Sequence, residues 1–82
     1  MSSNHFVVHG DYTETGMPLF ASDPHLKNAI PSSWMLYNLK LNDGSQSVSG
    51  AQLPGVPYVG IGRTKQIVWA FTTTRVDSSD LW

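Results

Sequence analysis

Apolar and polar residues alternate along short segments of this chain, and turn-forming residues separate these segments. The clearest alternation runs through residues 34–41, where one face of an extended strand carries Met35, Tyr37, Leu39 and Leu41. Asn42-Asp43-Gly44 is typical of a tight turn, so we expect a hairpin that ends near Gly50. No segment shows helical periodicity over three turns, and the pattern therefore predicts a mainly β chain.

A first hairpin is expected upstream of this one. Residues 6–9 form a short apolar run, and the polar and glycine-containing segment 11–16 leads into a second run at 17–21. Asp23-Pro24 is then expected to turn the chain, because the residue before a proline avoids the helical region and proline has no N–H donor.

Two further strands are expected at residues 56–62 and 66–72, around the polar loop Gly62-Arg63-Thr64-Lys65. The run at 67–71 is apolar without alternation, which suggests a strand covered on both faces. A chain of 82 residues has little material to cover it. We therefore expect a truncated reading frame, a fragment or a subunit that other chains complete.

Composition excludes several classes of protein. The chain is 40% hydrophobic and 13% charged with a formal net charge of −1, which indicates neither disorder nor nucleic-acid binding. It contains no cysteine, so no disulfide framework or thiolate zinc site is expected. We find no apolar run long enough to span a bilayer and no basic-then-apolar leader, so we expect no membrane span and no signal segment in this chain.

The serines near the amino terminus suggest chemistry at the end of the chain. A serine in the first position supplies both a nucleophile, its hydroxyl, and a base, its α-amine. The α-amine titrates at about pH 8 and can relay the hydroxyl proton. Two serines compete for this position, since removal of Met1 exposes Ser2, whereas removal of both residues exposes Ser3. The alternative is that Met1 only marks the start of a truncated frame.

Five segments of the chain carry a family pattern. In order they are Ser3-Asn4-His5-Phe6-Val7-Val8, Thr15 to Leu26 with Asp23-Pro24-His25-Leu26, Ser49 to Gly62 with Gly50-Ala51-Gln52-Leu53-Pro54-Gly55-Val56-Pro57, Ile67 to Thr73, and Asp77 to Trp82. Together they resemble the start of the catalytic β chain of the penicillin acylase family of N-terminal nucleophile hydrolases. The resemblance implies that residues 1–82 are a single partial domain, a mainly β fragment of an α+β fold that is a four-layer αββα sandwich in the full enzyme.

The resemblance also implies an activity, the hydrolysis of linear N-acyl amides through an acyl-enzyme. Ser3 aligns with the nucleophile, His25 with a histidine that helps to hold its amine, and the backbone N–H of Thr73 with an oxyanion donor. A second donor, an asparagine, lies far downstream in the family, so we expect the isolated chain to be incomplete. Phe71 is the preferred candidate for the wall of an acyl pocket, although core packing explains it equally well, as it does for Phe6, Trp34 and Trp69.

No cofactor is required for this chemistry, but the resemblance implies a structural calcium ion at Asp77, Ser79 (through its carbonyl) and Asp80. Solvated loop carboxylates are the alternative. The implied partners are an upstream α chain, the remainder of the β chain and a small N-acyl amide substrate, without nucleic acid. The resemblance implies a periplasmic or extracellular location.

The competing hypothesis is a catalytically inert β module, a truncated relic that acts as a structural or interaction piece. The asparagine missing downstream favours it, because strands and apolar faces left uncovered should bind a partner or aggregate. The two hypotheses differ in one requirement: an enzyme needs a free amine and a reactive hydroxyl on Ser3, whereas an interaction module needs neither.

Overall fold

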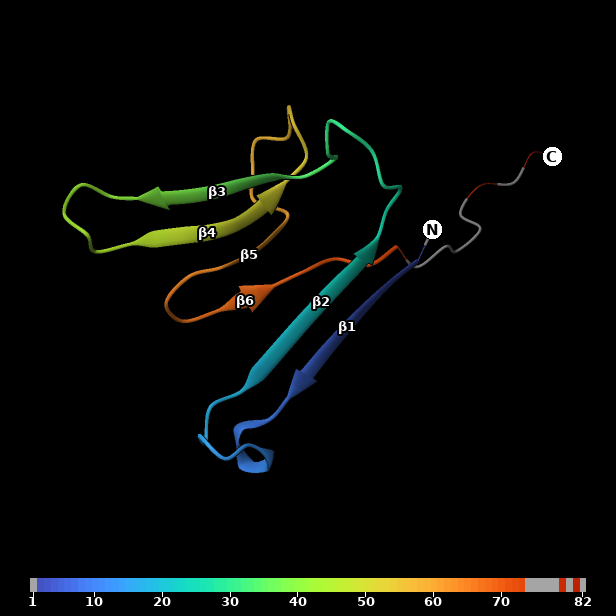
Figure 1. The fold of residues 1–82 in the computed structure, drawn as a ribbon. Helices are drawn as coiled ribbons and strands as arrows, with labels where there is room; N and C mark the ends of the chain where they lie inside the picture. Colours follow the sequence, from blue (N-terminus) through green and yellow to red (C-terminus); the bar gives the residue numbers. More distant parts are fainter. Residues whose placement is uncertain (1, 74–78, 80, 82) are drawn as a thin grey trace.

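The computed structural model describes residues 2–73, 79 and 81, and its strands form two antiparallel sheets (Figure 1). The first sheet pairs β1 (Ser2–Val8) with β2 (Leu19–His25). The second has the order β3 (Met35–Lys40), β4 (Ser47–Gln52), β5 (Ile61–Arg63) and β6 (Val68–Trp69). Within the described residues the only helical element is the 3-10 turn η1 (Gly10–Tyr12), which confirms a mainly β chain. None of these residues belongs to a helix that could cross a membrane.

The first hairpin is longer than the sequence indicated. β2 continues through Pro24 to His25, so the expected turn at Asp23-Pro24 is wrong. A proline is tolerated here because β2 has only one strand neighbour, and the missing N–H removes no bond from a second ladder. The chain turns later, where the N–H of Leu26 donates to the carbonyl of Pro24 at 3.1 Å.

The loop between β1 and β2 is held by Thr13. Its hydroxyl lies 3.0 Å from the carbonyl oxygen of Gly10 and 2.8 Å from that of Met17, so it ties the two sides of the loop together. Gly16 has a φ of 69°, a conformation that glycine adopts without strain. This closed loop fixes which residues of β1 and β2 lie opposite each other.

The structure confirms the second hairpin that the alternation and the turn residues predict. β3 and β4 pair from Lys40 opposite Ser47 to Met35 opposite Gln52, two residues beyond the expected end at Gly50. The N–H of Leu41 donates to the carbonyl of Gln46 at 3.0 Å and closes the loop. The left-handed conformation that the turn requires falls on a glycine, Gly44, whose φ is 70°.

The last two strands are shorter than expected. The segment 56–62 is mostly loop, and only its end belongs to β5, because Pro54 and Pro57 interrupt the pattern of backbone donors. The N–H of Val56 donates to the carbonyl of Leu53 at 3.1 Å, which makes a turn. β6 likewise occupies only the centre of the expected strand at 66–72.

The described residues contain no buried apolar side chain, and the only buried residue among them is Gly62. The chain exposes 7335 Å², against about 4,900 Å² for a compact monomer of this mass. In the run expected to be covered on both faces, Val68 is 49% and Phe71 65% exposed. The sequence therefore contains more apolar side chains in strand-like runs than these two sheets bury by themselves.

Close backbone approach at Gly50 generates the first prediction. A Cβ at Gly50 would clash with the carbonyl oxygen of Ile61 and lie 2.6 Å from the Cα of Gly62, whereas the nearest atom to a Cβ at Gly60 is 3.8 Å away. We expect Gly50→Ala to lower the free energy of unfolding by about 1–3 kcal/mol in urea titrations, because the overpacked strands must separate. Gly60→Ala is the matched control, and equal losses in the two variants would contradict the close approach.

The turn after β3 generates a prediction about pH. The hydroxyl of Ser45 donates to the carboxylate of Asp43 at 2.7 Å and its N–H does so at 2.9 Å, which lowers the pKa of Asp43 below 3.8. Because the pKa is lowered on folding, the stabilisation is present above the ordinary pKa and is lost as the pH falls through the folded value. NMR titration should show a higher pKa for Asp43 in Ser45→Ala and no change in the control Ser47→Ala. An unchanged pKa in Ser45→Ala would exclude the hydroxyl as the cause.

Candidate functional site

One cavity of about 280 Å³ collects residues from both sheets. It lies near the start of β1, the end of β2 and the segment that follows β6, which run close together in Figure 1. Ser3, Phe71 and Thr73, from opposite ends of the sequence, therefore share one cavity. Its lining residues are Ser3, Pro24, Leu26, Trp34, Leu53, Val56, Tyr58, Gly60, Ile61, Phe71 and Thr73.

The pairing of β1 with β2 places Ser3 on the cavity side. Ser3 lies opposite Pro24, and both residues are half-buried and line the cavity. Because side chains alternate along a strand, their neighbours in sequence, Ser2 and His25, occupy the other face of the hairpin. Both of those residues are exposed.

The hydroxyl of Ser3 donates to the carbonyl oxygen of Ser2 at 2.8 Å. The nitrogen of Ser3 is part of the Ser2–Ser3 peptide bond in this chain, and an amide nitrogen has no lone pair available as a base. Ser3 therefore acquires its own base only when the bond to Ser2 is cleaved.

His25 contacts Ser2 and Asp23. Its Nδ1 lies 2.9 Å from the hydroxyl oxygen of Ser2, and its Nε2 lies 2.9 Å from a carboxylate oxygen of Asp23. The ladder separates the face that carries these three side chains from the face that carries Ser3. A role for His25 in holding the amine of Ser3 stays a prediction.

Thr73 and Phe71 follow β6 in an extended segment. Since β6 ends at Trp69, no strand ladder of the described sheets uses the N–H of Thr73. Phe71 borders the cavity while remaining 65% exposed, so it has free surface that a ligand could cover. The role of Thr73 as an oxyanion donor and that of Phe71 as a pocket wall stay predictions.

The other aromatic candidates differ in position. Trp34 lines the cavity, whereas Phe6 lies on the outward face of the hairpin and is 64% exposed. The indole N–H of Trp69 donates to the carbonyl of Val59 at 2.8 Å and so fixes the loop before β5 against β6. Trp69 therefore has a structural partner close to the cavity without lining it.

Sequence reasoning missed several lining residues, and most of them belong to one segment, the loop 53–60. The apolar run that begins at Val56 predicts a strand over 56–62, which overlaps this loop at 56–60. The signal for a loop was present in Pro54-Gly55-Val56-Pro57, since two prolines and a glycine (Gly55 has a φ of 84°) rarely occur in a central strand. The missed residues are Pro24, Leu26, Leu53, Val56, Tyr58, Gly60 and Ile61.

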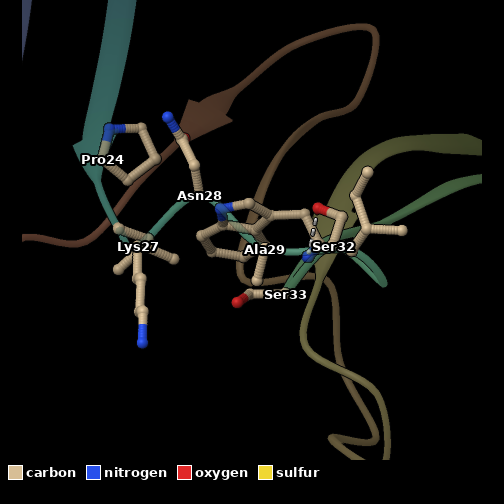
Figure 2. A pocket seen from close by; sticks show the side chains of 9 residues that line it. Pro24, Lys27, Asn28, Ala29, Ser32 and Ser33 are labelled. Carbon is tan, nitrogen blue, oxygen red and sulfur yellow. Dashed lines mark hydrogen bonds between the residues drawn. The ribbon is translucent and has the colours of Figure 1, made fainter.

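A second cavity has a volume of about 580 Å³, and Figure 2 shows the side chains that line it. The two cavities share Pro24, Leu26 and Trp34, and the rest of the second one comes from the loop before β3. The N–H of Trp34 donates to the hydroxyl of Ser32 at 3.2 Å, and the side chains of Lys27 and Asn28 point in opposite directions in Figure 2. Because a lysine, an asparagine and two serines belong to its lining, this cavity is more polar than the one that contains Ser3. Its loop contributes Lys27, Asn28, Ala29, Ile30, Ser32 and Ser33.

The expected calcium ligands are only partly described. Asp77 and Asp80 lie outside the described residues, and Ser79 is exposed. Within the part of the chain that the structure describes, no group of three or more His, Asp and Glu side chains is arranged to hold a metal ion. The calcium site stays a prediction.

Comparison with known proteins agrees with the motifs. The profile of the penicillin amidase family matches residues 1–82. The chain is 26% identical over 81 residues to the acyl-homoserine lactone acylase QuiP of Pseudomonas aeruginosa and 28% identical to that of Pseudomonas fluorescens. These matches cover 99% of this chain and 9% and 10% of the two relatives, so it spans about a tenth of their length. No solved structure gives a significant match. With the family profile matched from end to end, the chain belongs to the penicillin amidase family.

Proposed function

We propose that this chain supplies the nucleophile of an amidohydrolase that cleaves linear N-acyl amides through an acyl-enzyme. The observation that carries the proposal is the cavity shared by Ser3, Phe71 and Thr73. The cavity brings together a hydroxyl, a backbone N–H that no ladder of the described strands uses and an apolar wall, and acyl transfer needs these in addition to the base that the α-amine of Ser3 supplies after cleavage.

The proposed reaction begins after cleavage of the bond before Ser3. The hydroxyl oxygen of Ser3 attacks the amide carbonyl, and its proton passes to the α-amine of the same residue. The N–H of Thr73 stabilises the oxyanion, a contribution on the order of 3 kcal/mol per donor. The amine then protonates the leaving nitrogen as the C–N bond breaks, and water releases the acid from the ester on Ser3 by the same proton path.

The cavity and the similar proteins suggest the substrate class. The apolar lining, which includes Leu26, Trp34 and Phe71, suits an aliphatic or aromatic acyl group. Because the similar proteins are named acyl-homoserine lactone acylases, N-acyl homoserine lactones are the first substrates to test.

The exposed apolar surface supports the proposal that other polypeptide chains complete the fold of this one. We propose that an upstream α chain and the remainder of the β chain cover the exposed faces and build the four-layer αββα sandwich. We also propose that a calcium ion is held by Asp77, Ser79 and Asp80 in that complete enzyme, where oxygen ligands from other segments complete its shell.

An inert β module is the second candidate function. The exposed apolar side chains among the described residues favour it, because a large uncovered apolar surface is typical of a site that binds a partner. The two candidates differ in the reactivity of Ser3.

Intact mass spectrometry after treatment with an aryl sulfonyl fluoride tests the proposed function. A chain that begins at Ser3 should gain one adduct on Ser3, because the free α-amine activates the hydroxyl, and Ser3→Ala should gain none there. The same chain, assembled with the rest of its β chain and its α chain, should hydrolyse N-acyl homoserine lactones. An unmodified Ser3 in the chain that begins with it would favour the inert module.

Replacement of Phe71 tests the proposed acyl pocket. In the assembled enzyme, Phe71→Ala should raise the KM for an N-acyl substrate about tenfold or more, because an aromatic side chain contributes about 1.5–3 kcal/mol when a ligand covers it. Phe6→Ala is the matched control, since Phe6 lies on the outward face of the hairpin. Equal KM values for the two variants would exclude Phe71 from the pocket.

A further inference from the structure

A hydroxyl, an imidazole and a carboxylate form a continuous hydrogen-bonded series on the outward face of the first hairpin. The hydroxyl oxygen of Ser2 lies 2.9 Å from Nδ1 of His25, and Nε2 of the same ring lies 2.9 Å from the carboxylate of Asp23. Ser2 is directly opposite His25 in the ladder, and Asp23 lies two residues before His25 on the same strand face. The register of β1 and β2 therefore brings the three side chains together.

The partners of His25 favour one tautomer of its neutral ring. An ionised carboxylate only accepts hydrogen bonds, so Nε2 carries the proton that is donated to Asp23. In this neutral tautomer Nδ1 has a free lone pair, and the hydroxyl of Ser2 donates to it. A nucleophile bonded to a base, with that base oriented by a third group, is the arrangement that activates serine in many hydrolases.

We propose that Ser2, His25 and Asp23 form a second reactive centre, in which Ser2 accepts acyl groups from small activated esters. Asp23 is a positioning residue that holds the ring of His25. This activity goes beyond the proposed amide hydrolysis, because it needs Ser2 in place, whereas the amide chemistry of Ser3 needs Ser2 removed.

The step is a transesterification followed by hydrolysis. The hydroxyl oxygen of Ser2 attacks the ester carbonyl, its proton passes to Nδ1 of His25, and the bond to the leaving oxygen breaks as that oxygen takes the proton. Water then gives a proton to Nδ1 and attacks the acyl group on Ser2. The acid departs, and the oxygen of Ser2 recovers the proton from His25.

The exposure of the cluster sets the class of substrate. The side chains of His25 and Asp23 are 42% and 73% exposed, so a small ester reaches Ser2 directly from solvent. Solvent also weakens each hydrogen bond, and an open face lends little binding energy to the substrate. Esters with good leaving groups, such as p-nitrophenyl acetate, therefore suit this centre better than unactivated amides.

Residue-specific labelling of the whole chain, residues 1–82, tests the centre. Treatment with an aryl sulfonyl fluoride and peptide mapping should show an adduct on Ser2 that forms about tenfold or more faster than any on Ser45. Ser45 is an internal control, because its hydroxyl donates to Asp43 at 2.7 Å without a histidine between them. Equal rates at Ser2 and Ser45, or an adduct on Ser3 in place of Ser2, would overturn the proposal.

Substitutions separate the base from the positioning residue. His25→Gln should reduce labelling of Ser2 to the rate of Ser45, whereas Asp23→Asn should reduce it several-fold and Asp23→Glu should restore part of the rate. NMR of the unsubstituted chain gives an independent readout, in which the ring of His25 should carry its proton on Nε2. Unchanged labelling in His25→Gln, or a proton on Nδ1, would overturn the proposal. The test of Ser3 uses a chain without Ser2, so the two proposals fail independently.

Discussion

The register of the β1–β2 ladder is the constraint on which both proposed centres depend. Because side chains alternate along β1, Ser2 and Ser3 occupy opposite faces of the hairpin, and the pairing of Ser3 with Pro24 decides which face each serine takes. Ser3 borders the cavity that also contains Phe71 and Thr73, while Ser2 meets His25 on the outward face. A shift of one residue in β1 would exchange these faces. The loop that Thr13 closes therefore has a chemical consequence far from its own position.

The second constraint is that the described residues are too few to cover the apolar faces of the two sheets. The described residues bury no apolar side chain, yet they already form a cavity with an apolar lining. The bond from the indole of Trp69 to the carbonyl of Val59 holds part of this lining in place, because it fixes the loop before β5 against β6. A chain that spans about a tenth of the length of its relatives thus contains a cavity whose apolar surroundings remain exposed.

Local patterns predicted the elements that depend on local chemistry. The hairpin of β3 and β4 followed from the alternation at 34–41 and from Gly44, and the structure confirms it. The expected turn at Pro24 was wrong, because an edge strand accepts a proline. Family motifs selected Ser3, Phe71 and Thr73, which share a cavity, but the pairing of His25 with Ser2 required the ladder register. That register depends on the loop after β1, whose closure by Thr13 no pattern indicated.

The most direct test of this account is the register itself, measured by cross-strand NOEs between the backbone protons of β1 and β2 in the isotope-labelled chain. The account predicts contacts that pair Ser3 with Pro24 and His5 with Ser22. It also predicts contacts between the side chains of Ser2 and His25. Contacts that pair Ser3 with His25 instead would move Ser3 to the outward face, and they would contradict both the cavity site and the centre at Ser2.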